Sequence, residues 1–383
     1  MTKMHSISII AKRVSPESRE EAQQIISSLT YKNDTSVFLT DDWQLSWLAS
    51  LPTLPDIVLF YTVGKHHGDP APVGYTLLGT RAIKPYLPFQ VSLVNQSGHT
   101  KSDQVWVEFN DIICPDTMKH GCIKALIALV FKRYRNLQLT VSMCHKTAPW
   151  EQVCQQNNIT YSTLVTLAYR HKLPGAKQDI ETQLYNALSA NSRQQMRRTQ
   201  RAITSTFGHI TLTEAKHSEQ RDYFSALSPL HILKWGGTDE GSGFQNPYFV
   251  AHHTHLISQS PDRVALIKVT AGSTLLGYAY YLKDERNIYF YCAGVNEEIA
   301  TNKVKPGHVL HFLAMAHFAA QGYEAYDFMA GDFRYKKSLS NEGYTMATLT
   351  LVNPSRLSRL INKSWSGIKK ALHAVTRKAT TPP

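Results

Sequence analysis

Acidic, phenolic and basic side chains gather in residues 323–339, where the sequence reads Tyr-Glu-Ala-Tyr-Asp-Phe-Met-Ala-Gly-Asp-Phe-Arg-Tyr-Lys-Lys-Ser-Leu. The residues before the glycine alternate loosely between apolar and polar side chains, as in a short core strand, and the glycine permits a sharp exit. We therefore expect Asp327, Asp332, Tyr335 and Lys336 near the carboxyl end of that strand, where ligands bind in open α/β sheets. The structural alternative is that Asp327 caps a turn and Lys336 is a solvated surface charge.

A second group of reactive side chains begins at His231 and continues through Trp235. Four glycines follow within residues 236–243, which predicts a mobile loop of the kind that closes over a substrate. His231 is a candidate acid or base, the alternative being a histidine that only anchors the loop. The loop lacks the lysine and the spacing of a Walker motif, which argues against a nucleotide-phosphate cradle of that type.

The composition is that of a globular protein long enough for two domains, with 383 residues of which 43% are hydrophobic and 18% charged. The formal charge of +12 favours anionic partners: phosphate-bearing cofactors, nucleic acid or an acidic membrane face. Five cysteines without a CxxC pair predict reduced thiols rather than a zinc ribbon or a disulfide framework. Histidines cluster at residues 252–255 and at 308 and 311 without cysteines or spaced carboxylates, so no metal is expected.

The N-terminus has no secretory signal pattern, and no apolar run approaches the roughly 18 residues that span a bilayer. These features predict a cytoplasmic protein, and peripheral attachment to the inner membrane stays open.

Hydrophobic periodicity divides the chain into an α/β half at 1–170, a second α/β half at 171–354 and a C-terminal unit at 355–383. In the first half we expect strands at 5–14, 54–63, 73–82, 105–113 and 137–143, and helices at 15–29, around Trp43 and Trp47, and at 119–134 and 148–157. A break at 169–179 separates the halves. In the second we expect helices at 180–207, at 218–233 and from Pro306, and strands at 264–270, 275–282, 288–293, around Asp327 and at 345–352.

The C-terminal unit has a different pattern from the rest of the chain. Between residues 355 and 378, apolar residues that include Trp365 fall on one helical face, and seven Lys or Arg residues with no acid occupy the remainder. Such a basic amphipathic helix can lie in an anionic membrane interface. The alternative is a helix that docks on the domain and leaves its basic face in solvent.

The run Tyr-Asp-Phe-Met-Ala-Gly-Asp-Phe-Arg-Tyr-Lys at residues 326–336 resembles the DF-x-x-G-(D/E)-x-x-YK signature of GNAT-superfamily acetyltransferases of the CelD/BcsL type, which are linked to cellulose and other polysaccharide biosynthesis. The resemblance extends over about residues 37–339 and includes an R-x-x-x-R-R helix that contains Arg197 and Arg198. It implies two tandem GNAT-like domains of mixed α/β architecture, related to FemAB-like proteins, with the active site in the second domain.

The resemblance also implies roles for the site residues. Acyl transfer from acetyl-CoA or another acyl-CoA to an amine or hydroxyl needs a base for the acceptor and an acid for the departing thiolate. Asp327 or His231 is the expected base and Tyr335 the expected acid. Trp235, Asp332, Arg197 and Arg198 are the expected substrate contacts, although the two arginines also fit a solvated basic face.

In the GNAT layout the turn before a helix holds the pyrophosphate of coenzyme A through backbone N–H groups and the positive end of the helix dipole. Lys303, Lys305, Gly307 and His308 occupy that turn here, and Lys336 is expected to assist them. The turn matches only the first glycine of the usual Q/R-x-x-G-x-G/A pattern, because Val309 stands where the second small residue belongs.

The expected function is therefore acyl-CoA-dependent acyl transfer, of the N- or O-acetyl kind, to a sugar or sugar-linked acceptor in bacterial polysaccharide or cell-envelope biosynthesis. One alternative is a FemAB-like transferase that uses aminoacyl-tRNA, the single case in which a nucleic acid partner is expected. Another is a non-catalytic subunit of a polysaccharide-synthesis complex.

Overall fold

The computed structural model describes residues 8–29, 36–63, 71–84, 86–175, 179–239 and 241–355. The first part of the chain forms β1 (Ser8–Val14), α1 (Arg19–Ser27), α2 (Asp41–Ser50), β2 (Asp56–Val63), β3 (Gly74–Ala82), β4 (Gln90–Val94), α3 (Asp116–Phe131), β5 (Asn136–His145), α4 (Trp150–Gln156) and β6 (Tyr161–Lys172).

The second part begins with α5 (Ile180–Ala187), α6 (Ala190–Phe207), β7 (Ile210–Glu214), α7 (Gln220–Trp235) and α8 (Pro247–Gln259). It continues with β8 (Val264–Ala271), β9 (Thr274–Lys283), β10 (Asn287–Val295), α9 (Pro306–Ala320), β11 (Ala325–Ala330), α10 (Arg334–Leu339) and β12 (Glu342–Val352). Short 3-10 helices lie at Val37–Leu39, His217–Glu219, Gly243–Gln245, Pro261–Arg263 and Glu297–Ile299.

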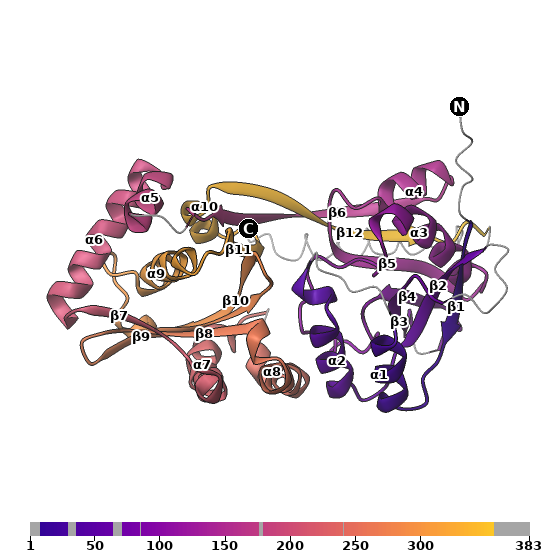
Figure 1. The fold of residues 1–383 in the computed structure, drawn as a ribbon, viewed down its shortest axis with the longest axis horizontal. Coiled ribbons are helices and arrows are strands. Elements are labelled where there is room, and N and C mark those ends of the chain that lie inside the picture. Colours follow the sequence, from indigo (N-terminus) through magenta and orange to yellow (C-terminus); the bar gives the residue numbers. More distant parts are fainter. Residues whose placement is uncertain are drawn as a thin grey trace, which may run out of the picture.

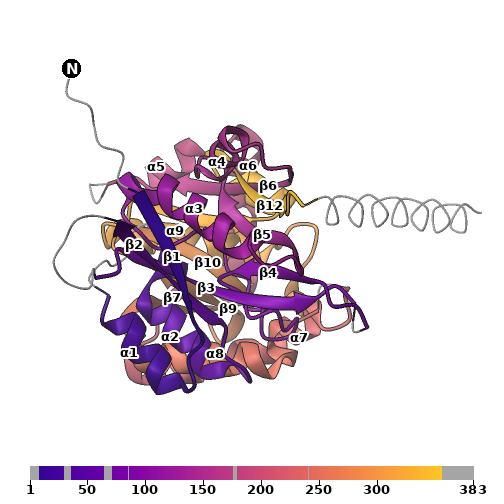
Figure 2. The same cartoon turned by 90° about the vertical axis from the view of Figure 1, so that its right-hand side faces the viewer.

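The strands form one mixed 12-stranded sheet in the order β1-β2-β3-β4-β5-β12-β6-β11-β10-β9-β8-β7. Figure 1 shows two lobes, which we call the first lobe (residues 8–160) and the second lobe (180–341), with β6 and β12 running between them. Figure 2, an end view, shows helices on both sides of the strands. This mixed α/β architecture with two lobes is the fold class that the sequence predicted.

The order of elements in the second lobe confirms the predicted core. β8, β9 and β10 form an antiparallel meander, α9 follows, and β11 then pairs with β10 in parallel. Pro306 occupies the first turn of α9, where its missing N–H costs nothing. In the first lobe, α1 begins at Ser18, whose side chain accepts a hydrogen bond from the N–H of Glu21 at 3.1 Å.

Two predicted elements differ from the structure. Residues 105–113 are not a strand, because Trp106 and Phe109 have positive φ angles of 44° and 51° that interrupt extended backbone, and only Ile113 makes an isolated bridge, to Tyr75. The helix predicted at 180–207 is two helices, because Ser189 caps a new one at α6. Strands β4, β6 and β7 and helices α8 and α10 were not predicted.

β6 and β12 exchange partners between the lobes. β12, from the end of the described chain, lies between β5 and β6, while β6 also pairs with β11 of the second lobe. The division of the chain at residue 170 stays a prediction, but this exchange makes the sheet continuous across it. Separation of the lobes would therefore require breaking β-ladders as well as side-chain packing.

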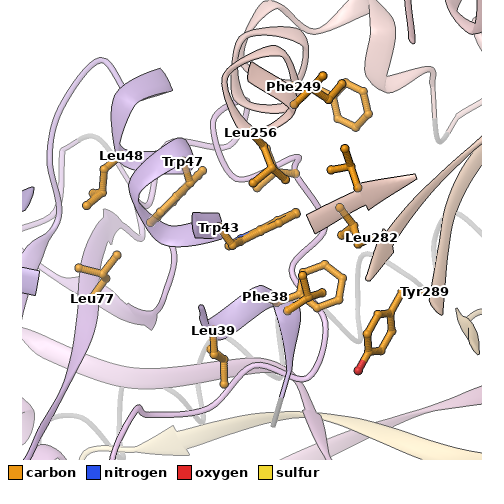
Figure 3. Packing of buried hydrophobic residues seen from close by; sticks show 14 of the residues in the cluster. Phe38, Leu39, Trp43, Trp47, Leu48, Leu77, Phe249, Leu256, Leu282 and Tyr289 are labelled. Atoms are coloured by element: carbon orange, nitrogen blue, oxygen red, sulfur yellow. The ribbon is translucent and has the colours of Figure 1, made fainter. Parts of the chain in front are cut away.

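Aromatic packing also joins the lobes. Figure 3 shows Trp43 of α2 and Phe38, which precedes it, directed toward Leu256, Leu282 and Tyr289 of the second lobe. Trp43 is 1% exposed and its ring contacts that of His252 in α8 with centroids 4.4 Å apart. Trp47, four residues later in α2, donates its indole N–H to the Ser102 carbonyl at 3.2 Å within the first lobe, whereas the Trp43 ring crosses the boundary between the lobes.

The C-terminal amphipathic helix predicted at 355–378 lies outside the described residues, apart from Ser355. Within the described ranges, every helix is too short or too polar to traverse a lipid bilayer.

Candidate active site

A gap opens between β10 and β11 in the middle of the second lobe. The two parallel strands pair over only three positions, Asn287↔Ala325 to Tyr289↔Asp327, although β10 continues to Val295 and β11 to Ala330. β10 also shifts register against β9 between Phe290 and Cys292, and such bulges bend a strand away from its neighbour. Because β10 and β11 diverge, there is room for a ligand between the carboxyl ends of these two strands.

This gap is part of a cavity of about 760 Å³. β10 and β11 line its inner wall, and the beginning of α9, the end of α7 and the start of α10 surround it. Trp106 and Glu108 of the first lobe complete the lining. The size is typical of a site for a small-molecule ligand, and both lobes contribute to it.

The end of β11 has an unusual backbone. Met329 has φ +60° and Gly331 φ +120°, and β11 shifts register against β6 between Asp327 and Ala330. The Asp327 carboxylate accepts the Met329 N–H at 2.7 Å and the Tyr344 hydroxyl at 2.8 and 2.9 Å. Asp327 therefore stabilises the bulge that turns the chain into the cavity wall.

Glu108 and Lys336 bind the backbone of Ala330, one at its N–H and the other at its carbonyl. The Glu108 carboxylate accepts the Ala330 N–H at 2.9 and 3.2 Å, and Lys336 Nζ donates to the Ala330 carbonyl at 2.5 Å. Burial raises the pKa of Glu108, and burial lowers the pKa of Lys336 although the two charges attract. A carboxylate with a raised pKa in a closed site is a suitable general base near neutral pH.

His231 and Tyr335 face the same cavity from α7 and α10. His231 Nδ1 shares a hydrogen bond of 2.8 Å with Ser242 Oγ, and burial together with Lys234 lowers the pKa of His231 to about 4, so the imidazole is neutral at pH 7. The Tyr335 ring stacks on His311 at 5.3 Å, and burial raises the pKa of its hydroxyl. Tyr335 is therefore protonated at neutral pH and able to donate a proton.

The N-terminus of α9 opens onto this cavity. Lys305, Gly307 and His308 line the cavity there, no side chain caps the helix, and its first turn contains no acid. Uncapped N–H groups at a helix N-terminus attract anions such as phosphate. A Cβ atom at Gly307 would meet nothing closer than Val295 at 3.5 Å, so the protein's own packing does not require glycine here.

Seven of the residues predicted from the sequence line this one cavity: His231, Trp235, Lys305, Gly307, His308, Tyr335 and Lys336. The other five do not. Asp327 lines a separate cavity of about 260 Å³ with Arg170 and His145, and Asp332 accepts a hydrogen bond of 2.7 Å from the hydroxyl of Tyr169.

Lys303 is exposed beside the α9 turn, and its carbonyl accepts a hydrogen bond of 3.1 Å from Thr199 Oγ1. On α6, the Arg197 guanidinium lies 5.0 Å from the centre of the Tyr185 ring, and Arg198 is exposed. Neither arginine lines the cavity, which fits the alternative of a solvated basic face.

Glu108 and Trp106 are the site residues that sequence reasoning missed. They lie more than 200 residues before the motif at residues 326–336, in a segment whose alternation predicted a strand, and Glu108 bonds to the Ala330 N–H of that motif. No local pattern marks them, because their position depends on how the lobes pack. In the described part of the chain, no group of three or more His, Cys, Asp or Glu side chains is placed to hold a metal ion.

Comparison with known proteins connects this geometry to a family. Residues 190–337 match the model of the acetyltransferase (GNAT) domain. No curated protein matches the sequence.

Among solved structures, FemX is 10% identical, with a TM-score of 0.53 over 91% of this chain and 99% of its own. The C-terminal domain of a putative lysylphosphatidylglycerol synthetase from Agrobacterium fabrum is 8% identical, with a TM-score of 0.52 over 91% of this chain and 97% of its own. At these identities the two structures show a shared fold. The domain match covers α9, the β11 motif and the cavity lining other than Trp106 and Glu108. Residues 190–337 are therefore similar to a GNAT acetyltransferase domain, and this similarity supports an acyltransferase activity.

Proposed function

We propose that this protein transfers an acyl group from acetyl-CoA or another acyl-CoA to an amine or hydroxyl of a sugar or sugar-linked acceptor in polysaccharide or cell-envelope biosynthesis. The observation that carries the proposal is the gap between β10 and β11, which ends at the uncapped N-terminus of α9. The acceptor class rests on the resemblance of residues 326–336 to the CelD/BcsL signature.

The diverging strands explain how the acyl carbonyl would be polarised. Beyond Tyr289, the edge of β10 that faces β11 has no partner strand among the described residues. Backbone N–H groups on such an edge can donate to a thioester carbonyl, and they stabilise the oxyanion that forms when the acceptor attacks. The phosphates of the donor would lie at Lys305, Gly307 and His308, where the helix dipole favours negative charge.

Proton transfer in this proposal uses residues that face the cavity. Asp327 was one of the two expected bases, with His231, but its carboxylate binds Met329 and Tyr344 and lines the other cavity. We therefore assign Glu108 as the base that takes the acceptor proton, with His231 as the second candidate. Tyr335 donates a proton to the departing thiolate, and Lys336 holds the Ala330 peptide in place.

Calorimetric titration with acetyl-CoA tests the donor. We expect saturable binding that weakens in Lys305→Ala and persists in Lys303→Ala, because Lys305 lines the cavity and Lys303, two residues earlier, does not. Equal loss in both variants would indicate general charge attraction rather than a phosphate site. If neither acetyl-CoA nor a longer acyl-CoA binds, the donor assignment is wrong.

A donor of the aminoacyl-tRNA type is the second candidate. The observation in its favour is that the α9 turn lacks the second small residue of the usual coenzyme A pattern: Val309 stands there and is completely buried. Transfer of a radiolabelled amino acid from charged tRNA, together with no binding of acyl-CoA, would support this donor.

A further inference from the structure

The partner exchange between the lobes leaves part of β6 with a free edge. β12 pairs with β6 along Tyr161–Arg170, but β11 on the opposite side pairs only with residues from Ala168 onward. Over residues 161–166, no described strand lies on that side. Figure 1 shows β6 running between α10 and α4, with β12 beside it.

The direction of the unpaired backbone groups follows from two hydrogen bonds. The Leu167 carbonyl accepts the Gly331 N–H on the β11 side at 2.9 Å, whereas the Thr160 carbonyl accepts the Val352 N–H on the β12 side at 2.8 Å. The N–H and C=O groups of successive residues point to opposite edges of a strand. In β6, the backbone groups of odd-numbered residues therefore point away from β12. The N–H and C=O groups of Thr163 and Val165 therefore face the free edge.

Apolar side chains surround this edge. Leu164 is 68% exposed, Val165 50% and Leu167 44%. From Tyr161 to Tyr169 the strand contains no charge, proline or glycine, which are the residues that usually protect an edge from another strand. Arg170 and Lys172 share Glu342, and Lys146 pairs with Glu151, so these three cations and two carboxylates leave an excess of one positive charge near the edge.

We propose that the free edge of β6 is a self-association surface, at which two copies of this chain pair antiparallel about a two-fold axis. Such a contact is isologous, because the same strand serves both partners. With the axis at Leu164, Thr163 of one copy lies opposite Val165 of the other, so their outward-facing backbone groups exchange hydrogen bonds. The two Leu164 side chains then lie opposite each other and cover apolar surface.

The test is sedimentation velocity of the full chain over a range of concentrations. We expect a reversible dimer for the unaltered protein. Val165→Pro removes an outward-facing N–H and leaves the β12 ladder intact, and Leu164→Lys places a charge on the axis of the dimer. Both variants should be monomeric. Tyr134→Lys changes another exposed large side chain, 60% exposed in the loop after α3, and should dimerise normally.

The outcomes separate the possible occupants of the edge. A monomer at every concentration, or a dimer that survives in both β6 variants, overturns the proposal. A chain that ends at Pro354 should dimerise like the full chain. If only the shortened chain dimerises, the C-terminal residues block the edge and the proposal is wrong for the full protein. Circular dichroism confirms that each variant is folded, so loss of the dimer is not mistaken for unfolding.

Discussion

Two charged residues of the motif, Asp327 and Lys336, and Glu108 of the first lobe act first on the backbone. Asp327, Glu108 and Lys336 each bind a peptide group of the bulge at Met329 and Ala330, through hydrogen bonds of 2.5 to 3.2 Å. A left-handed φ at a residue such as Met329 costs on the order of 1–3 kcal/mol unless its surroundings hold it. The motif thus shapes the cavity wall, and Glu108 and Lys336 also face the ligand space.

Glu108→Gln tests the base at the scale of a single atom. Glutamine retains an oxygen that accepts the Ala330 N–H, so the fold is kept, but it cannot take a proton. We expect kcat to fall by roughly 10²- to 10⁴-fold. In the unaltered enzyme, kcat/KM should decrease as the pH falls through the raised pKa of Glu108, because the base is then protonated. In the variant this acid limb should be absent. Thiol release from acetyl-CoA measures kcat and the pH dependence of kcat/KM. If the Glu108→Gln variant keeps the pH dependence of the unaltered enzyme, the base is His231.

Tyr335→Phe tests the proton donor. The phenyl ring can still stack on His311, so binding of the donor should be unchanged while kcat falls by about 10²-fold or more. Tyr169→Phe is the matched control, because Tyr169 bonds to Asp332 and does not line the cavity. Equal turnover of the Tyr335 variant and the unaltered enzyme would remove this role from Tyr335.

At the scale of elements, the turn from β11 into α10 positions the site. Gly331 has φ +120°, and a Cβ atom there would lie 2.9 Å from the Phe333 ring and 3.3 Å from Lys336 Nζ. The glycine is therefore required both for its backbone angle and for the close approach of two residues that line the cavity.

Gly331→Ala should destabilise the protein by about 1–3 kcal/mol and reduce activity, because Phe333 and Lys336 must move. Gly322→Ala is the matched control: Gly322 also has a positive φ, of 93°, but a Cβ atom there meets nothing within 4 Å. The Gly322→Ala variant should lose stability only because alanine is strained at a positive φ angle, and it should keep its activity. Urea unfolding and turnover separate the two effects, and equal activity of the two variants would contradict the role of the turn.

At the scale of the whole molecule, α2 and α8 join the lobes through buried rings. His252 and His253 of α8 pack against Trp43 with centroid distances of 4.4 and 5.8 Å. Burial lowers the pKa of His252 to about 3 and that of His253 well below its ordinary 6.5. The folded protein therefore keeps both rings neutral under conditions in which the unfolded chain binds protons.

This difference makes stability depend on pH. Because the folded pKa values are depressed and these groups are bases, the stability is complete above pH 6.5 and is lost as the pH falls toward 3. One pKa unit corresponds to about 1.4 kcal/mol, so His252 should cost roughly 2 kcal/mol of stability at pH 5, and His253 should act in the same direction.

His252→Phe should remove the share of this loss that His252 contributes, because other buried histidines such as His253 and His311 also have lowered pKa values. His209→Gln, at an exposed histidine, should not change it. Urea unfolding at pH 7 and pH 5 measures the change in the free energy of unfolding. If both variants lose as much stability between these pH values as the unaltered protein, His252 is not the cause of the pH dependence.

Local patterns predicted much of the fold and part of the site. The 2-residue and 3.6-residue periods located the β8–β10 meander, α9 and β11, because burial of one face repeats along the chain at those spacings. Where side-chain-to-backbone contacts outweighed the pattern, the prediction was wrong: the loop that carries Trp106 alternates like a strand but turns twice through positive φ.

The sequence by itself determined that the chain is mixed α/β, and it indicated that His231, Trp235, Lys305, Gly307, His308, Tyr335 and Lys336 are site residues. Only the tertiary structure brought these seven to one cavity and moved Asp327 to the wall behind it. It also placed Glu108 of the first lobe in the lining of this cavity and β12 between β5 and β6. The physical reason is sequence separation, because contacts between residues more than 150 positions apart depend on how whole elements pack, and this leaves no periodic signal in the local sequence.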